Sequence, residues 1–121
     1  MSDCPFCNST NLIIENHLAF AQYDLYPVSP GHMLIITKRH VADFFATTPE
    51  ERQALNDILE EAKYLLDRDF GPDGYNVGIN CGEAAGQTIM HVHIHLIPRY
   101  KGDIDNPRGG VRGVIPDKRI Y

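Results

Sequence analysis

Residues 88–97 read Thr-Ile-Met-His-Val-His-Ile-His-Leu-Ile, and a proline follows at position 98. From His91 onward, three histidines alternate with three apolar residues. Since the side chains of a β-strand point to its two faces in turn, the pattern predicts a strand with the histidines on one face and the apolar residues on the other, against the core. Imidazole rings carry polar nitrogens that need partners, so three of them side by side are typical of a functional site rather than of packing.

Residues 48–71 carry the clearest helix signal in the chain. The segment opens with Thr48-Pro-Glu-Glu51, which supplies an N-cap threonine, a proline at the first helical position and a glutamate that completes a capping box. Apolar residues then recur at helical spacing, and Phe70-Gly-Pro72 ends the pattern. We expect one helix of about 20 residues that packs on one side.

Shorter apolar runs bounded by turn residues predict further strands, at residues 12–15, 18–23, 32–38 and 75–80. Strands on both sides of a single long helix favour an α+β domain with a mostly antiparallel sheet. A length of 121 residues corresponds to one domain. We therefore expect a single domain over residues 1–121, with a core at about residues 4–100 and a C-terminal tail at 101–121.

The formal net charge is −5, from 16 acidic and 11 basic residues. This acidic surplus argues against a nucleic-acid partner, because proteins that coat nucleic acids are normally basic. The charge is unevenly distributed: residues 50–69 of the predicted helix carry −4, whereas residues 99–121 carry +3. The basic segment directly follows the histidines, which favours a small anionic ligand such as a phosphate ester.

No apolar run approaches the length of a membrane span, about 20 residues, so we expect no membrane partner. The first residues, Met-Ser-Asp-Cys-Pro-Phe-Cys, lack the basic and apolar regions of an export signal, which predicts a cytoplasmic protein. In that compartment the close pair Cys4 and Cys7 indicates metal or redox chemistry rather than a disulfide. Cys81 stands alone, and the sequence assigns it no role.

Two chemistries suit the histidine strand. Neighbouring imidazoles can bind zinc, or one imidazole can attack phosphorus while the others hold charge and protons. The preceding segment, Gly82 to Thr88, offers backbone N–H groups and a hydroxyl that can hold a phosphoryl group, which favours the second chemistry for at least part of the cluster. The pair Cys4 and Cys7 likewise has three possible roles: half of a zinc site, a redox pair or two ordinary thiols.

The run His91-Val-His-Ile-His-Leu-Ile97 resembles the signature of the histidine triad (HIT) superfamily. Two other motifs agree with this family in the same order along the chain: Gly86-Gln87-Thr88 is similar to its lead-in, and Pro30-Gly31-His32, followed by Leu34-Ile35-Ile36 and His40, is similar to its Pro-x-His strand. Asn80 stands where members carry a phosphate-contacting asparagine, and Asp24 where many carry a ribose-binding residue. The resemblance covers about residues 4–100 and implies a five-stranded, mostly antiparallel sheet with one long and one short helix.

The resemblance implies a nucleotidyl hydrolase or transferase that cleaves a nucleoside phosphate at the α-phosphorus, with a dinucleoside polyphosphate or an adenosine phosphoramidate as the type of substrate. His93 would be the nucleophile and form a covalent nucleotidyl-histidine, from which a nucleoside monophosphate is released. His95 would contact the phosphate and handle the leaving-group proton, and His32 would orient the nucleophile's side of the pocket. The remaining implied residues are Thr88 for catalysis and Asp24, Asn80 and Gln87 for substrate binding. Arg99 is a further candidate for substrate binding, because it is a basic residue that directly follows the triad. No organic cofactor is implied.

The zinc-binding branch of this family holds its metal with two cysteines and two histidines, which in this chain are Cys4, Cys7, His40 and His91. A closed Cys2His2 site of this kind is structural, because no coordination position stays open. Family members are typically homodimers. The resemblance therefore implies a zinc-containing homodimer with a small nucleotide as its ligand.

Two other functions stay open. One is a nucleotide-binding regulatory protein that keeps the pocket and has little turnover. The other is a uridylyltransferase-like enzyme, although that family is far longer and carries His-Pro-His at the triad. The chain has no tryptophan, whereas the best-known HIT branch often carries one near the C-terminus that reaches the partner's site. The sequence therefore does not determine the base or the leaving group of the substrate.

Overall fold

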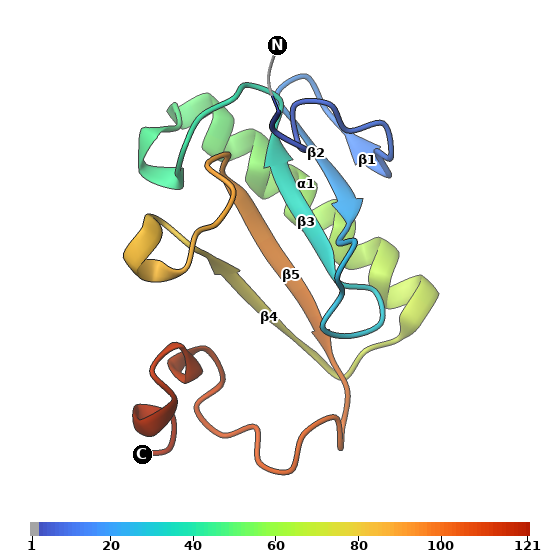
Figure 1. Ribbon diagram of the computed structural model, residues 1–121. Helices are drawn as coiled ribbons and strands as arrows, with labels where there is room; N and C mark the ends of the chain where they lie inside the picture. Colours follow the sequence, from blue (N-terminus) through green and yellow to red (C-terminus); the bar gives the residue numbers. More distant parts are fainter. Residues whose placement is uncertain (1–2) are drawn as a thin grey trace.

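The computed structural model describes residues 3–121 and contains a five-stranded sheet and one long helix (Figure 1). The strands are β1 (Ile14–Glu15), β2 (Ala19–Tyr23), β3 (Met33–Thr37), β4 (Gly74–Ile79) and β5 (His93–Arg99). The helix α1 spans Pro49–Phe70. The short 3-10 helices are η1 (Phe44–Ala46), η2 (Glu83–Ala85), η3 (Gly110–Val114) and η4 (Pro116–Lys118). The predicted α+β class is confirmed, and 3-10 turns stand in place of the single short helix.

All strands pair antiparallel in the order β1-β2-β3-β5-β4, so β5 lies between β3 and β4. Its His95 lies opposite Leu34 of β3, and its His93 opposite Ile36. The strand begins only at His93, so the alternation from His91 predicts a strand that starts two residues too early. The backbone N–H of Val92 donates to the carbonyl of Val41 rather than to β3. This turn separates the first histidine of the run from the other two.

Helix α1 covers one face of the sheet and buries its apolar stripe there (Figure 1). The apolar residues in this core include Leu55, Ile58 and Leu66 of α1, Met33 and Ile35 of β3, and Ile94 and Leu96 of β5. A second, smaller apolar cluster consists of Phe6, Phe20, Leu34 and Ile36. Because strand side chains alternate, His93 and His95 lie on the face that α1 leaves uncovered.

Both ends of α1 are closed as the sequence predicts. The Thr48 hydroxyl accepts the N–H of Glu51 at 3.1 Å, and the Glu51 carboxylate accepts the N–H of Thr48 at 2.9 Å. At the other end, Gly71 has φ 57° and ψ 47°, a left-handed conformation that glycine adopts without a Cβ clash, and its N–H donates to the last carbonyls of the helix. These caps determine where α1 begins and ends.

Glu51 also joins the start of α1 to the segment that follows β3. Its carboxylate accepts two hydrogen bonds of 2.8 Å from the guanidinium of Arg39, and its side chain is only 3% exposed. The hydrogen bonds from Arg39, together with the N–H of Thr48, lower the pKa of Glu51 to about 2. Because Arg39 immediately precedes His40, this ion pair also restrains the segment that carries one predicted metal ligand.

We expect Glu51→Ala to lower the free energy of unfolding by about 2 kcal/mol at pH 7, because it removes the cap and leaves Arg39 without its partner. The ionised carboxylate stabilises the fold above its ordinary pKa of 4.5, and this stabilisation is lost as the pH falls toward about 2. Urea unfolding of the wild type and of Glu51→Gln between pH 7 and pH 2 checks both statements. The carboxamide of Glu51→Gln still accepts from Thr48 but does not titrate, so a variant with the wild-type pH dependence would contradict this assignment.

The segment after β5 returns toward β4 through η3 and η4 (Figure 1). Gly110 approaches β4 so closely that a Cβ at this position would lie 3.3 Å from the amide nitrogen of Asn76. The guanidinium of Arg112 lies over the ring of Tyr121, 4.5 Å from its centre. None of the helices within residues 3–121 is long and apolar enough to span a membrane.

Candidate active site and metal centre

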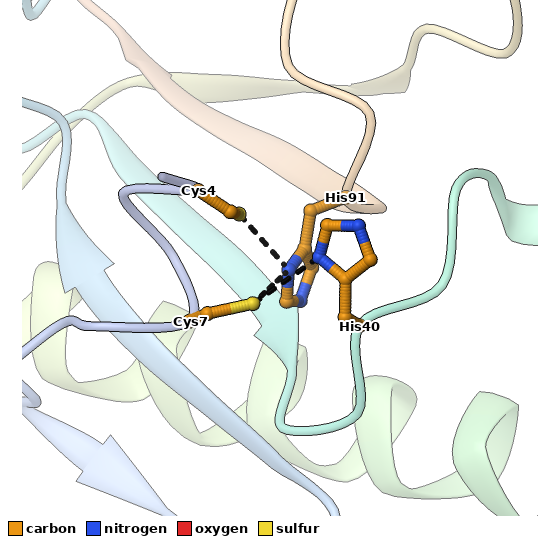
Figure 2. A group of neighbouring side chains, drawn as sticks. All are labelled: Cys4, Cys7, His40 and His91. Carbon is orange, nitrogen blue, oxygen red and sulfur yellow. Dashed lines mark hydrogen bonds between the residues drawn. The ribbon is translucent and has the colours of Figure 1, made fainter. Parts of the chain in front are cut away.

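Two cysteines and two histidines meet beside the start of β5 (Figure 2). One ligand atom from each of them lies within 4.8 Å of all the others. The Sγ of Cys7 lies 3.1 Å from Nδ1 of His40 and 3.5 Å from Nδ1 of His91, and the Sγ of Cys4 lies 3.4 Å from Nδ1 of His91. The N-terminal loop, the segment after β3 and the turn before β5 each supply part of this cluster.

The ring of His91 is oriented for ligation through Nδ1. Its Nε2 lies 2.7 Å from the backbone carbonyl of Thr37, which can only accept, so the neutral ring carries its proton on Nε2 and presents the Nδ1 lone pair to the two sulfurs. Burial lowers the pKa of His91 and thereby favours the neutral ring. A carbonyl that accepts from the distal nitrogen is the usual outer support of a metal-binding histidine.

This donor set fits zinc. Two thiolates and two imidazoles form one of the common tetrahedral Zn²⁺ sets, and the four protein ligands leave no position for water or substrate. The four residues are those that the resemblance implies for the metal, and the structure brings all of them together. The site therefore suits a structural metal that ties the N-terminal loop to the sheet.

We expect purified, unchelated protein to contain about one zinc per chain, because the four ligands complete a tetrahedral site. Replacing both Cys4 and Cys7 by serine should remove the metal and lower the thermal unfolding temperature, since metal binding contributes directly to the stability of such sites. Elemental analysis and calorimetry measure the two effects.

The matched control for this experiment is Cys81→Ser, because Cys81 does not belong to the metal cluster. This variant should keep its zinc. Clearly substoichiometric zinc in the wild type would contradict the assignment.

A cavity of about 800 Å³ lies on the uncovered face of the sheet, next to the metal cluster. Its walls come from the N-terminal loop between Pro5 and Asn11, from the end of β2 and the residues after it, and from β5. Asp24, Asn80, Thr88, His93 and His95 line it, so five of the predicted catalytic and substrate-binding residues share one cavity.

A hydrogen bond to the backbone determines which ring nitrogen of His93 carries the proton. Its Nδ1 lies 2.8 Å from the carbonyl oxygen of His91, to which it must donate, so the neutral ring has an unprotonated Nε2. The ring of Phe6 meets His93 edge-on, with 5.0 Å between the ring centres, and meets His91 at 5.8 Å. Phe6 lies between the two cysteines in sequence, so the candidate metal loop also packs on this imidazole.

His32 and His95 form a hydrogen-bond chain with a direction. The N–H of Val28 donates to Nδ1 of His32 at 3.1 Å, so neutral His32 carries its proton on Nε2. That nitrogen lies 3.0 Å from Nδ1 of His95 and 3.5 Å from the carboxylate of Asp24. His95 therefore accepts at Nδ1 and carries its own proton on Nε2. Burial is the main cause that lowers the pKa of both His32 and His95.

The same three side chains, Asp24, His32 and His95, also bring their ligand atoms within 4.8 Å of one another. A metal on Nε2 of His32 would require the proton to move to Nδ1, where the N–H of Val28 already donates. The geometry therefore favours a hydrogen-bond chain over a second metal site.

Two predicted substrate residues lie elsewhere. Gln87 is buried, and its amide accepts from Gly82 N–H at 2.8 Å and donates to the carbonyls of Ala42 and Ile89, so it shapes the loop instead of lining the cavity. Arg99 pairs with Asp103 through two hydrogen bonds of 2.8 Å at the far end of β5. It lines a separate shallow depression there. The basic residue after the triad thus stabilises the turn that follows β5.

Sequence reasoning missed Ser9 and Gln22, which both line the cavity. Gln22 is a polar residue in the apolar run 18–23 and lies two positions from Asp24. Period-two alternation places these two side chains on the same face, which was the available signal. Ser9 lies in a loop, where no periodicity indicates direction.

Comparison with known proteins identifies the family of the chain. The HIT domain family model matches residues 7–102, and the chain belongs to this family. It is 38% identical over 97 residues to the bis(5'-adenosyl)-triphosphatase of Dictyostelium discoideum, a match that covers 80% of this chain and 65% of that protein.

Two solved structures share the fold. A HIT family protein from Bacillus anthracis has a TM-score of 0.78 at 35% identity, over 84% of this chain and 77% of that one. A zinc-bound histidine triad family protein from Mycobacterium smegmatis has a TM-score of 0.75 at 31% identity, over 84% of this chain and 78% of that one. The second of these shows that a relative of this fold binds the metal that suits the Cys2His2 cluster.

Proposed function

We propose that this protein is a nucleotidyl hydrolase or transferase that cleaves a nucleoside phosphate at its α-phosphorus. The observation that carries the proposal is the fixed tautomer of His93. Its Nδ1–H donates to the carbonyl of His91, so Nε2 carries the lone pair. His93 also lines the cavity. A neutral imidazole with a free Nε2 is a competent nucleophile at neutral pH.

In the proposed reaction, Nε2 of His93 forms a bond to the α-phosphorus as the bond to the leaving oxygen or nitrogen breaks. The electron pair of the broken bond departs with the leaving group. The nucleotidyl group is then bound to His93. Water or another acceptor attacks the same phosphorus, the P–Nε2 bond breaks, its electron pair returns to the imidazole, and the proton that the acceptor loses passes to solvent. The carbonyl of His91 stabilises the ring while it carries the phosphoryl group, because Nδ1 keeps its proton throughout.

His95 is the proposed donor to the reacting phosphate. Its Nε2 carries the proton because its Nδ1 accepts from His32, and it shares the cavity with His93. In this proposal His32 acts through His95 as a positioning residue. The carboxylate of Asp24 lies 3.5 Å from Nε2 of His32. Thr88 and Asn80 line the same cavity and supply a hydroxyl and an amide for phosphoryl oxygens.

Dinucleoside polyphosphates are the first substrates to test, because the Dictyostelium relative is named for a diadenosine triphosphate. Adenosine phosphoramidates are the second type, because they also have an α-phosphorus that imidazole can attack. The proposed zinc acts outside the reaction: it would hold the N-terminal loop, which forms one wall of the cavity, against the sheet.

We expect His93→Ala to lower turnover of the best substrate by about a thousandfold or more, with nucleoside monophosphate binding retained, because only the nucleophile is lost. Product analysis over diadenosine polyphosphates and adenosine phosphoramidates identifies that substrate. Mass spectrometry of protein quenched under alkaline conditions during turnover should locate the nucleotidyl group on the peptide that contains His93.

His17→Ala is the control, since His17 is exposed in the turn between β1 and β2. Wild-type activity in His93→Ala would refute the assigned nucleophile. Nucleotide binding by the wild type without turnover on any of these substrates would favour the regulatory binding protein.

We also propose that the protein is a homodimer. Strand β4 is an edge of the sheet, and Val77 in it is 44% exposed. An exposed edge with unpaired backbone groups is a ready surface for a second copy. Light scattering should give twice the chain mass for the wild type, and Val77→Lys should shift the equilibrium toward monomer; a monomeric wild type would refute this proposal.

A further inference from the structure

The cavity contains one polar pair that the proposed chemistry does not use. Gln22 is only 8% exposed, and its carbonyl oxygen accepts a hydrogen bond from the hydroxyl of Ser9. Its neighbours on this face are largely apolar, including Phe6, Phe20 and Leu34. Burial of a carboxamide among apolar side chains is unfavourable unless both of its ends have partners.

Only one end of this carboxamide has a partner within the chain. Among residues 3–121, no acceptor is recorded for Nε2 of Gln22, and this nitrogen is not sealed from the cavity that the residue lines. Because Ser9 donates to the carbonyl end, the two N–H groups of the amide are the free hydrogen-bonding groups here. The amide end of Gln22 therefore presents donors to a bound molecule.

The position of Gln22 across the sheet from β5 indicates which part of a nucleotide it meets. Asp24 lies next to the His32 and His95 end of the cavity. Gln22 lies opposite Leu34 of β3, and Leu34 lies opposite His95 of β5. Gln22 is therefore level with His95 and about 10 Å across the sheet from it, at two strand spacings. A nucleoside places its base on the side of the sugar away from the phosphate, so a substrate with its phosphorus at His93 would direct its base toward Gln22.

We propose that Gln22, oriented by Ser9, is a specificity-determining residue that reads the nucleobase and favours a base with a carbonyl oxygen over one with an amino group at the same position. The inference rests on the proposed function, because that function places the phosphorus at His93. The carboxamide N–H donates to an exocyclic carbonyl oxygen. An exocyclic amino group is itself a donor and leaves this N–H without a partner in a mostly buried position.

Inosine and adenosine monophosphate are matched probes, because inosine carries a carbonyl at the 6-position of the purine where adenosine carries an amino group. Calorimetric titration of the wild type should give about tenfold tighter binding of inosine monophosphate, the size expected for one buried hydrogen bond lost with its donor unpaired. Gln22→Leu should bring the ratio of the two dissociation constants to about one, because it removes the donor.

The variant Ser9→Ala tests whether the orientation of the Gln22 carboxamide matters, because it keeps the carboxamide and removes the hydroxyl that orients it. Without the Ser9 hydroxyl the carboxamide can turn over and offer its oxygen to an amino group. The ratio should again fall toward one, while the affinity for adenosine monophosphate stays the same or rises. A simple packing defect would weaken both nucleotides together.

Gln53→Leu is the matched control, since it makes the same chemical change at an exposed position of α1. This variant should keep the wild-type ratio. A wild-type ratio near one, or an unchanged ratio in Gln22→Leu, would overturn the role of Gln22 and leave the chemistry of His93 untouched. Failure of the wild type to bind either nucleotide would overturn the proposed function as well.

Discussion

The geometry of the site depends on His91, which connects the candidate metal centre to the proposed nucleophile. One ring nitrogen faces the two cysteine sulfurs, the other donates to the carbonyl of Thr37, and the backbone carbonyl accepts from Nδ1 of His93. With all three groups engaged and the residue fully buried, the ring cannot rotate without loss of several hydrogen bonds. The residue that completes the donor set therefore also selects the tautomer of the imidazole beside it. Phe6 reinforces this link, because its ring packs on both histidines.

Both the candidate metal centre and the cavity depend on neutral imidazole rings. Burial lowers the pKa values of His32, His91 and His95, and a neutral imidazole is what metal ligation and directed hydrogen bonding require. His32 and His95 lie 3.0 Å apart, so a charge on one disfavours a charge on the other. The hydrogen-bond chain from Val28 through these two rings can then hold a single arrangement of protons.

One face of the sheet packs the core, and the other face carries the candidate site. The face under α1 is apolar, and the helix places its acidic surface on the outside of that layer, away from the cavity. The opposite face carries the histidines, Asp24 and Gln22, and the N-terminal loop covers it in place of a second helix. The global charge of −5 is therefore mostly a property of the helix surface and has little bearing on the ligand.

Much of this arrangement follows from local sequence, and the rest depends on contacts between distant segments. Alternation from His91 predicted the strand and the sides of its residues, because the period of a strand leaves little choice; the caps at Thr48 and Gly71 determined the helix for a similarly local reason. Local patterns contain no information about long-range pairing, so they could not show that Arg99 donates to Asn76 of β4 or that Gln87 donates to the carbonyl of Ala42. By itself the sequence determined the class of fold, the histidine strand and the candidate ligands. Only the tertiary structure decided which nitrogen of each histidine carries a proton and which side chains share the cavity. The reason is that the folded backbone brings each ring to its partner, which is distant in the chain for His91 and His95 and near in it for His32 and His93.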